Sequence, residues 1–384
     1  MNEFKFNGVG QGLFYSGTLF NGGFNFVFDC GTANKKSYLD EPINSYIQKI
    51  SHGKEKPHID FVVISHLHKD HFSGLPELAK NAVIDRLYLP YLGGNRDFIR
   101  FALAYAIFYD SDNNNARNFY ENILLFKYML KVYGLEDDLP DEERLDVPIP
   151  QRIIYGYNRN INKRTDLEIG ENEVIYYNNL WRFELYFRSF NLQVIDDLLS
   201  RIYNLVGSFE SAKLIDFICK SYNADAIKSI AKEYEAVFGK ANHHKLTGGV
   251  NISSIVMVHY PLYYGAYALI RGGNVDNSDF KSDCVVTVLT GDGQDFDRYP
   301  GLIESVKEKD ILFFQVPHHG AYDNWISVKK ADFLKCKIEY FVLSFGLGNP
   351  YGHPHVNTVE SLTNSKKCLY LITQLGSLAY SIDG

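Results

Sequence analysis

Residues 66–71 of the sequence place four metal-binding side chains within six positions: His66, His68, Asp70 and His71. Two imidazoles one residue apart can bind one cation, and the Asp-His pair that follows can bind a second cation close by. The alternative is a polar loop whose histidines cluster by chance. So many ligands directly behind an apolar strand argue against that alternative, and the spacing predicts a two-metal site.

The residues around this motif predict how the ligands are held. The run 61–64 is short, apolar and β-branched, as expected of a buried strand. The stretch 75–80, with Pro76 near its start, is expected to begin a helix. A loop between a strand and a helix lies at the open end of an α/β sheet, where such proteins bind ligands. We therefore expect the motif to face an open cleft.

Three later apolar runs are also predicted strands, and each is followed by a carboxylate or by histidines. These pairs are 284–290 with Asp292, 311–316 with His318 and His319, and 340–345 with His353 and His355. A soluble protein has little reason to place such groups at several strand ends unless they converge. We expect them to meet the metal loop at one site.

The start of the chain predicts a β-hairpin, because Asn21-Gly22-Gly23 separates the β-rich runs 14–20 and 24–28. Asp29 follows the second run in a Gly-containing turn, near the sheet end that the metal loop also leaves. We interpret Asp29 as a carboxylate that orders the metal loop by hydrogen bonding. Direct metal binding by Asp29 is the alternative.

The pattern changes between residues 92 and 249, where helical periodicity dominates. The predicted helices are 97–109, 116–133, 194–206, 209–222 and 224–238, with one alternating strand at 181–187. We take 92–249 as a mostly helical insertion. It is rooted at the ligand-bearing end of the sheet, so it can line the cleft, or it can form a homodimer surface. Its aromatic residues are assigned to a core, with base stacking as the alternative.

The composition bounds the class of protein. The 384 residues are 46% hydrophobic and 22% charged, and the formal net charge is −7. No apolar run is long enough to span a bilayer, and the first residues lack the pattern of a signal peptide. The five scattered cysteines indicate reduced thiols. We expect a cytoplasmic protein with no membrane partner and no overall electrostatic affinity for nucleic acid.

The H-x-H-x-D-H spacing at 66–71 resembles the metal-binding signature of the metallo-β-lactamase superfamily of hydrolases. Further motifs resemble, in the same order, the superfamily domains related to the competence protein ComEC. These motifs are Val9-Gly10-Gln11-Gly12, Asp29-Cys30-Gly31, Asn251-x-Ser253-Ser254, Leu289-Thr290-Gly291-Asp292, Pro317-His318-His319-Gly320 and Gly348-Asn349-x-Tyr351-Gly352-His353-Pro354-His355. The resemblance implies an α/β fold, in which residues 1–91 and 250–384 form an αββα sandwich and 92–249 are inserted into it.

With this resemblance in view, we divide the ligands between two cations. The first is assigned His66 and His68, the second Asp70, His71 and His319, and Asp292 bridges both. Nitrogen and oxygen ligands accept Zn²⁺, Mn²⁺ or Fe²⁺. Many superfamily members have a third histidine where this chain has Asn251. That departure weakens the case for Zn²⁺ and strengthens the case for Mn²⁺.

Four residues are assigned catalytic roles. Asp70 is counted among them as well as among the ligands, and His318 is expected to contact a phosphate or support a ligand, although His318 and His319 could exchange roles. His353 and His355 are candidates for the general acid, with His355 favoured, and loop architecture is the alternative for that pair.

The leading functional hypothesis is a phosphodiesterase or nuclease that acts on nucleic acid or nucleotides through metal-activated water. Extra histidines around two cations suit an anionic phosphodiester, and ComEC-like domains are implicated in DNA handling. The resemblance also points to phage-defence partner proteins. The alternatives are hydrolysis of a carboxylic ester, lactone or thioester, and a binding or sensor protein with a structural metal site.

Overall fold

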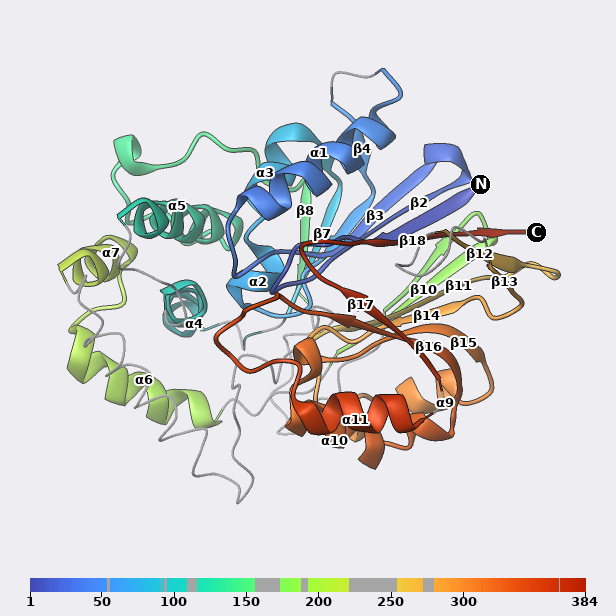
Figure 1. The fold of residues 1–384 in the computed structure, drawn as a ribbon. Coiled ribbons are helices and arrows are strands. Elements are labelled where there is room, and N and C mark those ends of the chain that lie inside the picture. Colours follow the sequence, from blue (N-terminus) through green and yellow to red (C-terminus); the bar gives the residue numbers. More distant parts are fainter. Residues whose placement is uncertain are drawn as a thin grey trace.

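Two mixed β-sheets pack face to face, and helices cover both outer faces (Figure 1). This arrangement is seen in a computed structural model, which describes residues 1–53, 56–90, 92, 95–108, 116–155, 173–187, 193–220, 254–271, 280–365 and 367–384. The α/β sandwich predicted from the sequence is therefore confirmed. The predicted helix at 224–238 and the residue Asn251 lie outside the described residues.

The first sheet has nine strands among the described residues. From β12 to β3 the neighbouring strands pair antiparallel, whereas β3, β5, β7 and β8 pair parallel. The order across the sheet is β13 (Phe280–Ser282), β12 (Tyr267–Arg271), β18 (Leu378–Asp383), β1 (Asn2–Phe6), β2 (Phe14–Leu19), β3 (Phe24–Cys30), β5 (Phe61–Val63), β7 (Arg86–Leu89) and β8 (Arg152–Tyr155).

The second sheet has seven described strands, and its parallel half carries the later site residues. Its order is β17 (Cys368–Ile372), β16 (Lys337–Ser344), β15 (Asp310–Gln315), β14 (Val286–Leu289), β11 (Val256–Pro261), β10 (Trp181–Tyr186) and β9 (Glu173–Tyr177). A small parallel pair is formed by β4 (His58–Ile59) and β6 (Val83–Ile84).

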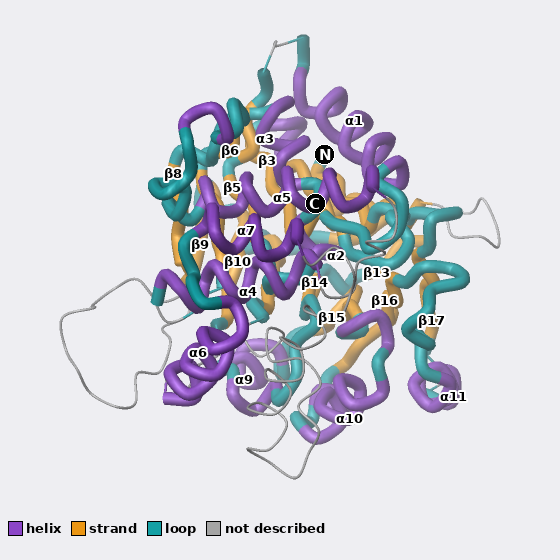
Figure 2. Tube along the Cα trace, turned by 90° about the vertical axis from the view of Figure 1, so that its left-hand side faces the viewer, coloured by secondary structure: helices purple, strands orange, loops and turns teal. Residues whose placement is uncertain are grey.

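Helices form the two outer layers. On the first sheet lie α1 (Ser37–Ser51), α3 (Leu75–Asn81), α4 (Arg96–Phe108) and α5 (Ala116–Val132). The helices α6 (Gln193–Val206) and α7 (Ser211–Lys220) lie outside α4 and α5 (Figure 1), and α4 to α7 are seen together in Figure 2. On the second sheet lie α9 (Leu302–Val306), α10 (Tyr322–Lys330) and α11 (Val356–Asn364). The one-turn helix α2 (Lys69–Phe72) belongs to the metal loop. Single 3₁₀ turns occur at η1 (Phe20–Gly22), η2 (Asp141–Glu143), η4 (Phe296–Arg298), η5 (His318–Gly320) and η6 (Phe333–Lys335).

The continuous apolar runs of the strands follow from burial on both faces. In β3, Phe24, Phe26 and Phe28 point between the sheets, whereas Val27 and Cys30 point toward the helices. Residues one apart on a strand face opposite sides. The central strands are therefore apolar at most positions, on both faces.

Aromatic side chains fill much of the space between the sheets. His259 is fully buried among them, and its Nε2 lies 2.8 Å from the hydroxyl of Tyr15. That hydroxyl lies 2.6 Å from the hydroxyl of Tyr380, which in turn lies 2.6 Å from Oγ1 of Thr287. Burial lowers the pKa of His259 to about 3. A neutral imidazole within a hydrogen-bonded chain thus joins strands of the two sheets.

The segment 92–249 is only partly an addition outside the sheets. Its helices α4 and α5 begin and end within a residue of the predicted limits, and their aromatic residues, such as Phe101, Phe126 and Tyr128, are buried in a core. However, β8 extends the first sheet, and β9 and β10 extend the second. The expected insertion therefore includes strands of both sheets. The sequence did not indicate this, because a strand joins a sheet by pairing with strands that are distant in the chain.

None of the helices in the described part of the chain is both long enough and apolar enough to cross a bilayer. The five cysteines are free thiols, as expected; three are buried, whereas Cys219 and Cys368 are exposed.

A buried carboxylate on β10 ties the second sheet to α9. Glu184 is 2% exposed and accepts hydrogen bonds from the hydroxyls of Tyr186, Ser305 and Tyr260, the last over 2.8 Å. It also lies 2.7 Å from Nε of Arg182. Burial raises the pKa of Glu184, but the hydroxyl donors and the guanidinium outweigh it and lower the pKa below the usual 4.5.

We expect Glu184→Gln to destabilise the fold by about 1–3 kcal/mol at pH 7, because it removes a charge that four groups solvate. A carboxyl group with a lowered native pKa stabilises the fold fully above its unfolded pKa, and this contribution is lost as the pH falls through the native value. The difference between wild type and variant should therefore shrink below pH 4.5. Urea unfolding from pH 3 to pH 7 measures it, with the exposed Glu142→Gln as control. A difference that does not change with pH would contradict this account.

Candidate metal centre

The metal loop leaves the end of β5 and closes over the turn that follows β3. The backbone N–H of Leu13 donates to the carbonyl of Asp70 over 3.1 Å, which holds the loop down. Gly31 lies directly below it: a Cβ at this position would come within 2.4 Å of the Asp70 and His71 backbone. Only glycine permits such a close approach. The Asp29-Cys30-Gly31 motif therefore has a structural reason in this chain.

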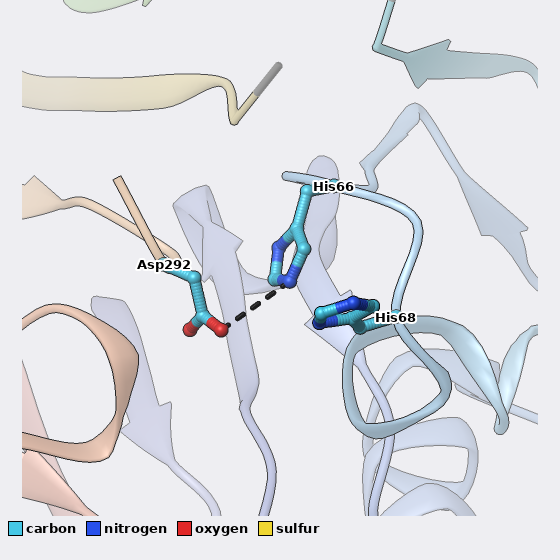
Figure 3. Close-up of side chains that lie close together, drawn as sticks. All are labelled: His66, His68 and Asp292. Atoms are coloured by element: carbon cyan, nitrogen blue, oxygen red, sulfur yellow. Dashed lines mark ion pairs between the residues drawn. The ribbon is translucent and has the colours of Figure 1, made fainter. Parts of the chain in front are cut away.

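The first ligand group consists of His66, His68 and Asp292, whose ligand atoms all lie within 4.8 Å of one another (Figure 3). His66 and His68 come from the loop after β5 in the first sheet, and Asp292 follows β14 in the second. Nε2 of His66 lies 3.3 Å from Oδ2 of Asp292. The group is thus formed where the ends of the two sheets meet.

The second group consists of Asp70, His71 and His319, again with ligand atoms within 4.8 Å. Nε2 of His319, after β15, lies 3.0 Å from Oδ2 of Asp70. Nε2 of His71 lies 3.2 Å from Oδ1 of Asp292. Asp292 therefore presents one carboxylate oxygen to each group, which is the arrangement that a bridging ligand requires.

The donor atoms of this centre fit divalent cations. Nε2 of His66, Nε2 of His71 and both carboxylate oxygens of Asp292 are buried and make no hydrogen bond. Leaving such atoms without a partner costs about 1–3 kcal/mol each, more for charged groups. Cations placed between them would satisfy all four. Imidazole and carboxylate donors suit Zn²⁺ and Mn²⁺.

Asp29 positions His71, which confirms the interpretation that it orders the metal loop. Its Oδ2 accepts hydrogen bonds from Nδ1 of His71 and from the hydroxyl of Ser65, both over 2.7 Å. Its Oδ1 accepts from the backbone N–H of Ser65 over 2.6 Å. With Nδ1 donating to Asp29, the lone pair of His71 Nε2 is left free on the side of Asp292. Carboxylates that hold a ligating histidine in this way also raise its basicity.

Backbone groups position His319 and Asp292. Nδ1 of His319 donates to the carbonyl of Ser344 over 2.8 Å, so its Nε2 faces Asp70. The amide oxygen of Gln315 accepts from the backbone N–H groups of Thr290 and Gly291 and holds the turn before Asp292. Gly291 has φ +54°, and a Cβ there would lie 2.5 Å from Oγ of Ser65. The glycine is required both for this backbone conformation and for contact between the sheets.

His318 and His319 differ in burial and in partner, which separates their roles. The His318 side chain is 23% exposed, and its Nε2 lies 3.5 Å from Oδ2 of Asp292. Its Nδ1 lies 3.0 Å from Oδ1 of Asn324, whose amide nitrogen donates to the carbonyls of Asp292 and Gly293. His318 is thereby held at the edge of the ligand groups, facing the cleft.

His353 and His355 do not lie together at the centre. The ring of His353 lies 5.2 Å from that of His318, and His353 lines the cleft. His355 instead caps α11: its Nδ1 accepts from the backbone N–H of Asn357 over 3.2 Å, and its ring packs against Tyr322. His353 lines the cleft and His355 does not, so the geometry favours His353 over the preferred His355 as general acid.

Burial and neighbouring charges shift the pKa values of the titratable groups of the centre in different directions. Burial lowers the pKa of His68 to about 3 and that of His353 to about 4, in each case helped by neighbouring histidines. Burial also disfavours a charged His71, but three carboxylates outweigh it and raise its pKa well above 6.5. Although burial acts against the Asp292 carboxylate too, adjacent histidines hold its pKa well below the usual range. The carboxylates of the centre thus favour positive charge at this place, which is the charge that a cation would supply.

The centre opens into a cleft of about 1050 Å³. His68, Asp70, His318, His319 and His353 lie on it. Its walls come from the start of α1, from α3 and from α4 and α5, including Tyr105, Arg117, Glu121, Leu125 and Tyr128. Part of the 92–249 segment therefore lines the cleft, as the first of its two predicted roles requires.

The supporting groups were not predicted from the sequence. Asn324 has a weak signal, since it lies six residues after His318 at the start of a helix. The carbonyl of Ser344 has none, because every residue carries a carbonyl group.

Asp292→Ala should remove both metals or leave one weakly held, because Asp292 offers one oxygen to each ligand group. The fold should persist, since the site lies at strand ends. Metal-to-protein ratios after dialysis, measured by mass spectrometry, give the result, and the exposed Asp297→Ala serves as control. A wild-type metal content in Asp292→Ala would refute the bridging assignment.

Asp29→Asn should lower metal affinity by about 10- to 100-fold without removing a ligand. The amide cannot accept from Ser65 and His71 with the same geometry, so the imidazole of His71 loses its orientation. Competition with a chromophoric chelator measures the affinity. Asp85→Asn, which alters a surface pair with His58, is the matched control. Unchanged affinity in Asp29→Asn would show that His71 does not depend on this contact.

Comparison with known proteins links the first part of the chain to a family. Residues 12–93 match the family model described as the Metallo-beta-lactamase superfamily. Among solved structures, Zn²⁺-bound PqqB from Methylobacterium extorquens is similar with 9% identity and a TM-score of 0.38, over 98% of this chain and 99% of that chain. The search of curated proteins found no significant match. The segment that carries the metal loop is thus similar to the metallo-β-lactamase superfamily.

Proposed function

We propose that this protein is a metal-dependent hydrolase of the metallo-β-lactamase type and that it cleaves phosphodiesters in nucleic acid or nucleotides. The observation that carries the proposal is the pair of ligand groups that share Asp292 at the end of a large, open cleft. A structural metal site would have no need of an open cleft at its ligands. This argues against a binding or sensor protein.

The residues of the centre have separate tasks in this proposal. Divalent cations bound by the two ligand groups would supply Lewis acidity and lower the pKa of a water molecule. Asp29 and Ser344 fix the orientation of His71 and His319, so that the ligand atoms are placed before substrate binds. Preorganised groups of this kind cost no rearrangement during the reaction.

His318 and His353 are the groups that can contact the substrate beside the ligands. His353 is neutral at neutral pH, since burial and its histidine neighbours hold its pKa at about 4. It can therefore donate a hydrogen bond through its N–H group or accept a proton, but it carries no positive charge before the reaction. Nδ1 of His318 donates to the amide oxygen of Asn324, so its Nε2 can donate to a phosphoryl oxygen only in the imidazolium form and otherwise accepts a proton there.

The charge of the cleft favours a phosphodiester over the second candidate, a carboxylic ester, lactone or thioester. Apart from the ligand Asp70, three acidic side chains line the cleft, against five basic ones. The whole protein has a formal net charge of −7, so this local excess of positive charge is not a general property of its surface. Opposite charge concentrates an anionic substrate in a cleft. The ComEC-type motifs support the same choice.

Anaerobic metal analysis followed by assays of four substrates tests the proposal. We expect turnover of bis-p-nitrophenyl phosphate and of at least one among single-stranded DNA, RNA and cyclic dinucleotides, with activation by Mn²⁺ or Zn²⁺. Asp292→Ala should abolish it, and Asp297→Ala should not. Hydrolysis of p-nitrophenyl acetate or a lactone with no turnover of any diester would favour the second candidate instead.

A further inference from the structure

A second charged feature of the cleft lies beside the metal centre and is not explained by metal binding. The basic side chains that line the cleft are Lys35, Lys36, Lys69, Lys80 and Arg117. Lys36 and Lys80 share Glu77 at 3.8 Å and 3.9 Å, distances too long for direct hydrogen bonds. This positive charge is therefore only loosely compensated within the protein.

Lys69 is the basic residue placed nearest to the chemistry, because it stands between the ligands His68 and Asp70. Its side chain is half-buried and lines the cleft. Among the described residues, it donates no hydrogen bond and forms no ion pair. Holding an ammonium group away from water without a partner is costly. A negative group from outside the protein would remove that cost.

A second cation faces the same part of the cleft from α5. Nε of Arg117 lies 3.1 Å from Oε1 of Glu121, and both residues line the cleft. The side chain of Arg117 is 84% exposed, so it can reach a ligand without losing much of its own packing. The charge of Glu121 also acts on Lys69. One carboxylate thus stands near two cations, where an incoming anion would be stabilised by both.

The size of the cleft points in the same direction. About 1050 Å³ is at the upper end of small-molecule sites, which hold about 300–1000 Å³. Tyr105 of α4 and Leu125 and Tyr128 of α5 also line the cleft and give it an apolar wall. A substrate that fills this space would carry flat or apolar groups as well as further negative charge beyond the scissile phosphate.

We propose that Lys69 and Arg117 form a subsite for a second phosphate group, so that the enzyme selects an oligonucleotide strand over a substrate with a single phosphodiester. The phosphate next to the scissile one lies on Lys69 and Arg117, and the adjoining nucleoside lies against the α4–α5 wall. The proposal rests on the proposed phosphodiesterase function and names the substrate class of the same cleft.

Two chromogenic substrates with the same leaving group test this subsite. One is the p-nitrophenyl ester of thymidine 5′-phosphate, with a single phosphate, and the other is the same ester of the dinucleotide TpT, with one phosphate more. We expect wild type to prefer the dinucleotide in kcat/KM. Lys69→Met should lower that preference by about tenfold, as expected for a lost charge-assisted hydrogen bond. Arg117→Met should also lower it, and Glu121→Gln should raise it by about threefold.

Three controls separate the subsite from other effects. Lys69→Arg keeps the charge and should retain most of the preference, and Lys335→Met, at a surface pair with Asp332, should leave it at the wild-type value. Metal content is measured for each variant. If Lys69→Met loses metal, its lower preference could come from the metal centre. The result for Arg117→Met then decides whether the subsite exists, because Arg117 lies away from the ligands. A wild-type preference in Arg117→Met and in metal-loaded Lys69→Met would overturn the subsite.

The outcome for the subsite is distinct from the outcome for the proposed function. If wild type hydrolyses neither ester and none of the four diester substrates named above, the phosphodiesterase proposal fails. Fluorescence anisotropy with labelled 5′-phosphorylated TpT then measures the subsite directly. Weaker binding in Lys69→Met and Arg117→Met, together with tighter binding in Glu121→Gln, would support it. Equal binding by all three variants and wild type would overturn it.

Discussion

The contact of one carboxylate with two imidazoles sets the central constraint of this structure. Asp292 lies 3.3 Å from His66 and 3.2 Å from His71, with all four donor atoms buried and without hydrogen bonds. The histidines follow β5 of the first sheet, and Asp292 follows β14 of the second. The spacing of the ligands therefore depends on how the two sheets pack. The aromatic layer between them, with Tyr15, His259 and Tyr380 joined by hydrogen bonds, fixes that packing and so helps to place the metal centre.

Close backbone contacts between the packed segments fix the positions of the ligands. Gly31 lets the metal loop lie on the turn after β3, and Gly291 lets the loop after β14 approach Ser65. His71 and His319 are then oriented through their Nδ1 atoms, one by the Asp29 carboxylate and the other by a backbone carbonyl. Nε2 of His71 thus faces Asp292 and Nε2 of His319 faces Asp70 before any substrate arrives. Burying so many polar groups at strand ends costs free energy. Their preorganisation for binding and reaction is the benefit that offsets this cost.

Chemistry and substrate selection are carried by different parts of the chain. The sheets supply the ligands, whereas one wall of the cleft comes from α4 and α5, which belong to neither sheet. The cleft-lining residues of these helices are not among the ligands. The lining of the whole cleft is basic and apolar, which would suit selection of a substrate by its length and its charge.

The sequence by itself determined the local features. Short apolar runs and loops marked by glycine identify β3, β5, β14, β15 and β16, and the residues at their ends include all six ligands. These signals are local, because strand burial and loop position leave a pattern within a few residues. Only the tertiary structure decided that β8, β9 and β10 belong to the sheets, that His353 rather than His355 lines the cleft, and that Asn324 and the Ser344 carbonyl support the centre. These features depend on contacts between distant segments and on backbone groups that every residue shares, so no local pattern encodes them.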